Sequence, residues 1–332
     1  KKENMEVDKD IIVKGKEIVK QLNQKYGNIF GFIYRKREWC TSERCFMGWE
    51  RKRGILNQLN EYLITKKNPF LVNTWNDLPK IKYVITLDSD TKLVLNTGLK
   101  LIGTMAHILN KPEVNKITNT VEAGHALIQP RVGVGILAER KSMFTRIFAG
   151  SGGTDLYSNA ISDVYQDNFD EGIYTGKGIY DVEVFYEVLK GAIPENTVLS
   201  HDLLEGNYLR CGLSSDIVLM DGYPSHYISY KKRKHRWIRG DVQILPWLNS
   251  TLNFLSKYKI IDNIVRDIRE FCIILMLIFT YIASFYTNEK IYLIITLVLI
   301  AIPAILELVE YILGLKDNKQ KLIVNKLSNF QG

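Results

Sequence analysis

The sequence predicts an α/β domain with a mostly parallel sheet and flanking helices, followed by a hydrophobic helical hairpin. Over about the first 260 residues, short apolar runs typical of buried strands alternate with longer amphipathic segments. That alternation is the pattern of a parallel sheet covered by helices on both faces. Two long uncharged stretches then follow, at 271–286 and 291–306. Of the 332 residues, 46% are hydrophobic, which is enough to bury a sizeable core.

The elements of the domain are expected in a regular order along the chain. Apolar side chains recur on one helical face in four segments, and the helices are therefore expected over 7–25, 53–64, 97–109 and 181–189. Short apolar runs predict strands over 28–35, 83–87, 125–130, 173–176 and 215–221, the third of them ended by Pro130. The segment 139–166 is expected to be mostly helical, with a glycine-rich loop at 150–155.

The two uncharged stretches predict a helical hairpin in a membrane. Each is shorter than the roughly 20 residues that a membrane-spanning helix needs, but apolar neighbours can extend both. Lysine and arginine crowd the outer flanks of the hairpin, which by the positive-inside rule places both flanks and the α/β domain in the cytoplasm. We therefore divide the chain into a domain over 1–260, an interfacial segment with two transmembrane helices over 261–315, and a tail over 316–332. A buried hairpin of a soluble protein is the alternative.

The net charge of +8 suggests an anionic partner such as a nucleic acid, an acidic lipid or a phosphorylated small molecule. Much of this charge lies in basic runs beside aromatic residues, and such a run is often only a solvated face. The longest run contains Arg233 and Arg236, which share a helical face, with Trp237 beside them. Arginine binds phosphate through two parallel hydrogen bonds, and tryptophan offers a flat surface for a sugar. No recognisable nucleic-acid module accompanies the run, so we expect no nucleic-acid partner.

Asp88 and Asp90 follow directly on the apolar run 83–87. In an open α/β sheet, ligands bind beyond the carboxyl ends of the strands. Two carboxylates so close repel each other unless a cation lies between them. Mg²⁺ or Mn²⁺, completed by substrate phosphates, suits oxygen ligands of this kind. The sequence therefore favours a metal site here over an ordinary surface turn.

Two further short motifs are candidates. Asp202 stands at the predicted start of a helix, where the dipole stabilises its charge, although a simple helix cap explains it equally well. Gly176 and Gly178 flank Lys177 after a predicted strand. Glycine lets the backbone approach a ligand and lysine pairs with an anion, but the spacing is not that of a phosphate-binding loop. A tight turn is the alternative for this second motif.

Taken in order, "ERKRGILN", "LDSDT", "SHDLLEG" and "RKHRW" resemble the motifs of processive, membrane-bound, inverting glycosyltransferases of the GT-A type. Longer strings are similar to one family in particular: "MGWERKRGIL", "YVITLDSDT", "YTGKGIYDVEVF", "PENTVLSHDLLEG" and "HRWIRGD". They resemble the glycosyltransferase domain, of family 84, of cyclic β-1,2-glucan synthases. The resemblance extends over roughly residues 15 to 270.

The resemblance implies a UDP-glucose donor, a growing β-1,2-glucan acceptor, a divalent metal (Mg²⁺ or Mn²⁺) and a GT-A-like fold. Asp202 would be the general base, and Asp88 and Asp90 would hold the metal and the diphosphate. Further residues would contact donor or acceptor: Lys52 and Gly54 at the nucleotide, Gly176, Lys177 and Gly178 near the donor sugar and acceptor, Glu205 on the acceptor side, and Arg233, Arg236 and Trp237 at the diphosphate and sugar.

The resemblance also implies a multi-pass protein of the inner membrane whose catalytic domain faces the cytoplasm and contacts membrane lipid. The first βα unit of the GT-A fold, with its uracil pocket, is expected before residue 1, as part of a larger enzyme with further domains. Two other readings stay open. One is a membrane-tethered basic domain that binds an anionic polymer or lipid without catalysis, and the other is the same scaffold with another donor or linkage.

Overall fold

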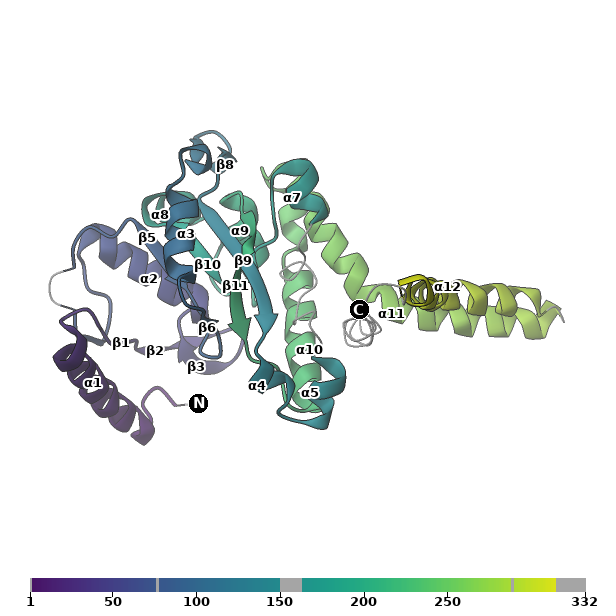
Figure 1. The fold of residues 1–332 in the computed structure, drawn as a ribbon, viewed down its shortest axis with the longest axis horizontal. Helices are drawn as coiled ribbons and strands as arrows, with labels where there is room; N and C mark the ends of the chain where they lie inside the picture. Colours follow the sequence, from purple (N-terminus) through teal and green to yellow (C-terminus); the bar gives the residue numbers. More distant parts are fainter. Residues whose placement is uncertain (1, 76–77, 150–162, 288–289, 315–332) are drawn as a thin grey trace.

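The computed structural model describes residues 2–75, 78–149, 163–287 and 290–314, which form an α/β body and a long helical arm (Figure 1). The loop expected at 150–155 and the tail expected over 316–332 lie outside these residues. The body contains one central sheet and three two-stranded sheets. The small sheets pair β1 (Ile33–Tyr34) with β4 (Val72–Asn73), β2 (Arg37–Cys40) with β3 (Cys45–Gly48), and β7 (Glu113–Asn115) with β8 (Thr120–Ala123).

The central sheet is mixed, so the prediction of a mostly parallel sheet was wrong. Its strand order is β5 (Tyr83–Thr86), β10 (Gly178–Asp181), β9 (Leu127–Val134), β11 (Gly212–Asp221) and β6 (Lys92–Leu93). Of the four pairings, only β9 with β11 is parallel. β10 begins at the edge of the sheet where β5 ends, with Gly178 opposite Thr86. It therefore lies antiparallel to both of its neighbours, β5 and β9.

Several expected strands have different bounds in the structure. The strand predicted over 28–35 is reduced to β1, and the one predicted over 215–221 begins earlier, at Gly212. β9 continues through Pro130 to Val134, whereas the strand was predicted to end at Pro130. Pro130 has no N–H to donate, and its partner strand β11 shifts register between Ser214 and Val218, directly after the pairing of Ser214 with Pro130. This irregularity lets the ladder continue past the proline. The strand expected over 173–176 is a loop, and β10 begins at Gly178 instead.

The expected amphipathic helices are confirmed. They are α1 (Glu6–Tyr26), α2 (Arg51–Thr65), α3 (Thr97–Ala106) and α8 (Val182–Leu189). The described parts of 139–166 contain the short helices α4 (Ile136–Glu139), α5 (Met143–Phe148) and the start of α7 (Val164–Phe169). The remaining helices of the body are α9 (Asp202–Tyr208), α10 (Tyr227–Gln243) and the 3₁₀ turns η1 (Ile108–Asn110) and η2 (Leu245–Asn249).

The core lies on both faces of the central sheet. Successive residues of a strand point to opposite faces, and β10 shows this directly. Ile179 packs in a cluster with Leu101 and Met105 of α3. The next residue, Tyr180, packs in the other cluster, where its ring centroid lies 4.2 Å from that of Phe185 in α8. Burial on both faces fixes β10, and therefore holds the loop before it at one edge of the sheet.

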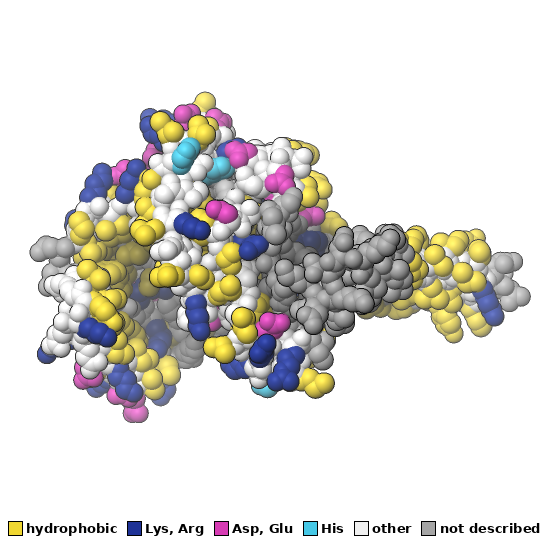
Figure 2. All heavy atoms as spheres, viewed as in Figure 1, with side chains coloured by type: hydrophobic (Ala, Val, Ile, Leu, Met, Phe, Trp, Pro, Cys, Tyr) yellow, Lys and Arg dark blue, Asp and Glu magenta, His cyan; other side chains and the backbone are white. Residues whose placement is uncertain are grey.

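The arm consists of α11 (Phe254–Thr287) and α12 (Ile291–Gly314), which lie side by side and project from the body (Figure 1). The boundary expected after residue 260 falls within α11. Taken one at a time, none of the helices in the described ranges has the length and apolarity to cross a membrane; the two halves of α11, Phe254–Arg269 and Phe271–Thr287, meet the criteria jointly but are bent by 49°. Figure 2 shows hydrophobic side chains toward the far end of the arm. Exposed apolar residues of the two helices include Phe279, Ile282 and Phe285 of α11 and Ile294 and Leu297 of α12.

Candidate active site

The segment between β5 and β6 crosses one edge of the central sheet. β5 and β6 are the two edge strands of the curled sheet, yet only residues 87–91 separate them in the chain. The segment therefore passes the start of β10 and the carboxyl ends of β9 and β11. It carries Asp88 and Asp90, so the structure places both at the edge where ligands of α/β proteins bind.

Two lysines hold the Asp88 carboxylate. Its Oδ1 lies 2.5 Å from Lys52 Nζ in the first turn of α2, and its Oδ2 lies 3.2 Å from Lys177 Nζ in the loop before β10. Burial opposes ionisation of Asp88, but the hydrogen bond from Lys52 and the charges of both lysines prevail and lower its pKa. Three motifs that are separate in the sequence thus meet at one carboxylate.

Lys177 is buried and lies between two carboxylates. Its Nζ is 2.7 Å from Asp221 Oδ2 at the end of β11, in addition to its contact with Asp88. Burial alone would lower the pKa of Lys177, but the negative charges of Asp221 and Asp88 outweigh the effect of burial, so the pKa of Lys177 is raised. Thr91 donates a hydrogen bond to the other oxygen of Asp221. Asp221 was not predicted, although it has the same signature as Asp88, a carboxylate directly after an apolar strand.

Asp90 lies across the edge from Asp88, beside the end of β11. A Cβ atom added to Gly222 would lie 3.0 Å from Asp90 Oδ2, so the absent side chain leaves room for this carboxylate. Asp90 is exposed, and no hydrogen bond or ion pair links its carboxylate to another residue in the described ranges. Of the two aspartates expected to hold a metal, Asp90 therefore has free oxygens, whereas both oxygens of Asp88 are occupied by lysines.

Asp202 begins α9 and lies against the backbone of Gly176. A Cβ atom on Gly176 would be 2.9 Å from Asp202 Oδ1, and the residue has φ +88°, a conformation that favours glycine. The carbonyl oxygen of the same Gly176 accepts a hydrogen bond from Lys52 at 2.5 Å. Gly176 therefore connects the candidate base to the lysines around Asp88. Asp202 does not cap α9 through its side chain, because the N-cap residue is His201.

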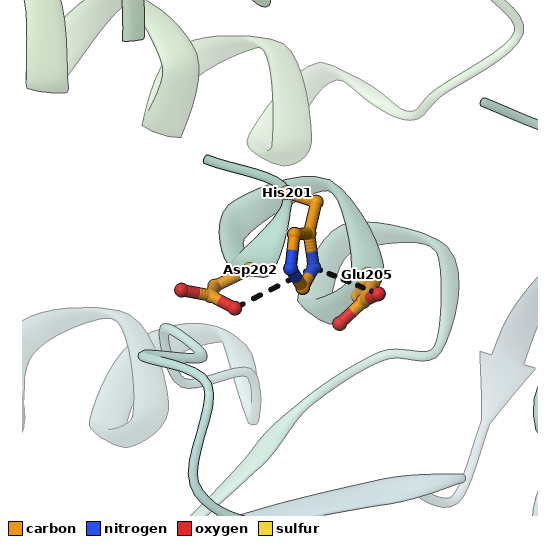
Figure 3. Close-up of side chains that lie close together, drawn as sticks. All are labelled: His201, Asp202 and Glu205. Atoms are coloured by element: carbon orange, nitrogen blue, oxygen red, sulfur yellow. Dashed lines mark ion pairs between the residues drawn. The ribbon is translucent and has the colours of Figure 1, made fainter. Parts of the chain in front are cut away.

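His201 lies between Asp202 and Glu205 (Figure 3). The Nδ1 atom of His201 lies 2.9 Å from Glu205 Oε1 and 3.5 Å from Asp202 Oδ1, although the angles are not those of hydrogen bonds. Burial lowers the pKa of His201, but the charges of Glu205 and Asp202 prevail and raise it. One ligand atom from each of the three side chains lies within 4.8 Å of the others, so the group has the composition of a metal site. Neither oxygen of the buried Glu205 has a hydrogen-bond partner among the described residues.

The structure places the remaining predicted residues at different distances from this network. Gly54 and Gly178 are confined by backbone, since a Cβ atom on Gly54 would lie 1.8 Å from the oxygen of Trp49, and one on Gly178 would lie 2.2 Å from that of Ile128. Both glycines therefore have a packing role. In α10, Arg233 lies over the Trp237 ring, 5.0 Å from its centroid. No hydrogen bond or ion pair between described residues joins Arg233, Arg236 or Trp237 to the lysine–aspartate network.

α10 contacts the candidate base region through its last turns instead. Gly240 approaches Ser200 so closely that an added Cβ would lie 2.5 Å from Ser200 Cβ. Gln243 accepts a hydrogen bond from the backbone N–H of Leu199 at 2.8 Å. The helix that contains the arginine–tryptophan motif is thus fixed to the segment that leads into His201 and Asp202.

Comparison with known proteins gives one informative similarity. No protein-family model matches the chain. The chain is 40% identical over 277 residues to a Rhizobium meliloti (strain 1021) protein described as cyclic beta-(1,2)-glucan synthase NdvB. The matched region is 81% of this chain but only 10% of that protein. The resemblance expected from the motifs is thereby confirmed, and this chain is related to a segment of a cyclic β-1,2-glucan synthase.

Proposed function

We propose that this chain contains the site of an inverting, processive glucosyltransferase that transfers glucose from UDP-glucose to a growing β-1,2-glucan. The observation that carries the proposal is the position of Asp202. Its carboxylate lies against Gly176, whose carbonyl binds Lys52, and the next residue in the chain is the buried Lys177. A base and two cations that suit a diphosphate therefore share one edge of the sheet. The similarity to a glucan synthase supports this assignment.

The two lysines are suited to bind the diphosphate of the donor. An ammonium group has three N–H donors. Lys52 donates one to Asp88 and one to the carbonyl oxygen of Gly176, whereas Lys177 forms ion pairs with Asp88 and Asp221. Each lysine therefore keeps one N–H for a phosphate oxygen. Because Asp88 and Asp221 fix both ammonium groups, the donor would meet charges that are already in position.

A divalent ion, Mg²⁺ or Mn²⁺, fits beside Asp90. The Asp90 carboxylate has free oxygens, and carboxylate together with phosphate oxygens is the ligand set that these ions prefer. When bound, such an ion neutralises charge that develops on the leaving diphosphate. The group of His201, Asp202 and Glu205 is the less suitable place, because a carboxylate that ligates a metal is a poor base.

Asp202 would act as the general base. The acceptor hydroxyl oxygen forms a bond to the anomeric carbon of glucose, the bond from that carbon to the diphosphate breaks, and UDP leaves with the electron pair. The hydroxyl proton passes to Asp202. The side chain of Asp202 is 30% exposed, so that an acceptor can reach it.

The exposed apolar surface of α11 and α12 supports a membrane location for the arm. Long apolar side chains such as Phe279 and Phe285 cover its surface, and a soluble monomer rarely exposes such a large patch. The body would then face the cytoplasm, as the basic flanks of the hairpin suggest.

The first prediction concerns the base. The intact protein, given UDP-glucose and Mg²⁺ or Mn²⁺, should release UDP and form β-1,2 linkages. Asp202→Asn should lower turnover by about 10²-fold or more, because the amide cannot take the proton. Linkage analysis of the product and an assay of UDP release measure this. Asp10→Asn, an exposed carboxylate of α1, is the control. Full turnover by Asp202→Asn would reject the base, and a protein that binds anionic polymer without releasing UDP would be a binding domain.

A second prediction uses two glycines of similar conformation. Gly176 and Gly191 have φ values of +88° and +77°, so alanine at either position costs about 1 kcal/mol of stability. Only at Gly176 would the new methyl group meet Asp202, since nothing lies within 4 Å of a Cβ atom at Gly191. Gly176→Ala should therefore lower kcat by about 10-fold or more, because it displaces the base, whereas Gly191→Ala should not. Equal kcat values for the two variants would contradict the contact between Gly176 and the base.

A third prediction concerns the metal. Chelation should abolish UDP release, and added Mn²⁺ or Mg²⁺ should restore it. Asp90→Asn should raise the metal concentration for half-maximal rate at least about tenfold, while the exposed Asp216→Asn should leave it unchanged. A rate of UDP release that is unchanged by chelator would reject the metal site, because the lysines alone would then balance the charge of the diphosphate.

A fourth prediction tests the arm. Phe279 and Leu99 are both 72% exposed, the first on α11 and the second on α3. In a background without the native cysteines, Leu99→Cys in membrane vesicles opened to the cytoplasmic face should react with a water-soluble maleimide. Phe279→Cys should react only after detergent is added, because lipid covers it. Equal labelling of the two positions before detergent would place α11 in water.

A further inference from the structure

A pocket opens between the β2–β3 hairpin, the start of α2 and the loop 195–201. Its volume is about 120 Å³, whereas a single enclosed water needs only about 10–15 Å³. It is therefore large enough for a ligand group bigger than water. Trp39 and Trp49 provide its aromatic surface, and His201 lines it from the side of the candidate base. None of the roles assigned above uses this pocket.

The side chains around the pocket suit a neutral polyhydroxylated ligand. Four carboxylates line it, from Glu38, Glu43, Glu50 and Glu195, together with the amides of Asn196 and Gln243. Carboxylates and amides accept hydrogen bonds from hydroxyl groups, and the face of tryptophan packs on the C–H face of a sugar ring. Arg51 also lines the pocket, but it pairs with Glu43, as does Arg239, and Glu50 pairs with Arg53. The two remaining carboxylates, Glu38 and Glu195, disfavour a diphosphate.

The walls of the pocket are fixed before any ligand binds. The buried Arg53 donates hydrogen bonds to Glu50 Oε2 at 2.6 Å and to the backbone oxygen of Ile193 at 2.8 Å. The other oxygen of Glu50 accepts the N–H of Asn196 at 2.5 Å. These bonds tie the start of α2 to the loop before His201. They also hold Glu50 and Arg51 at φ +49° and +52°, values that non-glycine residues rarely adopt. A preformed pocket loses little entropy when it binds a ligand.

The pocket and the lysine–aspartate network are neighbours, since Arg51 lines the pocket and the next residue, Lys52, binds Asp88. His201, the neighbour of Asp202, faces the pocket. The Asp202 carboxylate itself lies against Gly176, on the side of Lys52 and Asp88. In an inverting transfer the acceptor hydroxyl lies beside the base and attacks the anomeric carbon opposite the leaving diphosphate. A sugar ring held in a pocket that His201 lines is therefore close to the candidate base.

We infer that the pocket binds a glucose unit of the neutral glucan acceptor, with the ring stacked on Trp39 or Trp49 and its hydroxyl groups bonded to Glu38 and Glu195, the lining carboxylates that have no hydrogen bond or ion pair among the described residues. This inference rests on the proposed glucosyltransferase function and assigns the acceptor side of that site. Trp39 is 55% exposed at the rim, where a sugar ring can reach it. Its ring is also supported from behind by Phe46, with the centroids 5.3 Å apart.

The test separates the acceptor from the donor. With the intact protein, KM for a β-1,2-linked glucotriose is measured at saturating UDP-glucose, and KM for UDP-glucose at saturating glucotriose. Trp39→Ala should raise KM for the glucotriose about tenfold and change KM for UDP-glucose much less. Trp39→Phe, which keeps a ring, should have a smaller effect. Phe254→Ala removes an exposed aromatic ring outside the pocket and is the control.

The carboxylates are tested in the same way. Glu195→Gln should raise KM for the glucotriose, whereas Glu187→Gln, at an exposed position on α8, should not. An unchanged KM for the glucotriose in both Trp39→Ala and Glu195→Gln would overturn the inference. A rise in KM for UDP-glucose in its place would also overturn it, because the pocket would then belong to the nucleotide.

A calorimetric titration with the glucotriose tests the pocket even if the protein has no transferase activity. A wild-type protein that releases no UDP would reject the transferase, but the pocket can still be assayed by binding. The wild type should bind the glucotriose, and Trp39→Ala should bind it about tenfold more weakly. The absence of binding by the wild type, or equal binding by both proteins, would overturn the pocket assignment independently of turnover.

Discussion

The site depends on the ammonium group of Lys177 and on the two carboxylates that make its burial possible. A buried charge is costly unless it is paired and hydrogen-bonded. Lys177 is paired with Asp221, the last residue of β11, and with Asp88, which follows β5, while Lys177 itself lies just before β10. One cation thereby fixes three elements of the sheet at the same edge. Removing either carboxylate would leave a partly compensated charge and also loosen the edge on which the other motifs lie.

Lys52 extends this arrangement to Asp202. It binds Asp88 and the carbonyl oxygen of Gly176, and Gly176 in turn supports the Asp202 carboxylate. The position of the candidate base is therefore set by electrostatic pairing several residues away, as well as by the packing of α9. Two lysines face Asp88 and Asp221, and Asp90 and Asp202 add negative charge to the same region, so the edge has no excess of positive charge. The approach of a doubly charged diphosphate is then decided by the N–H groups that remain free and by an ion beside Asp90.

Local patterns in the sequence predicted the parts of the fold that depend on local physics. The periodicity of apolar residues predicted the amphipathic helices. Asp88 was predicted as a site residue because a charge directly after an apolar run has few structural explanations. The direction of β10 could not be predicted in this way, because an apolar run looks the same in either direction. Asp221 had the signature of Asp88 but no neighbouring motif to draw attention to it. The pocket could not be predicted from the sequence either, because its walls come from distant segments: Glu50 and Asn196, which are bonded to each other, are 146 residues apart in the chain.

In the group of His201, Asp202 and Glu205, the two carboxylates have different relations to the imidazole. Burial disfavours the imidazolium, but Glu205 and Asp202 outweigh it, and the pKa of His201 rises. Glu205 is buried and closer to His201 than Asp202 is, with separations of 2.9 Å and 3.5 Å, so it is the main partner of the imidazolium. The Asp202 side chain is 30% exposed and lies against Gly176, so it is the carboxylate of this group that an acceptor can reach.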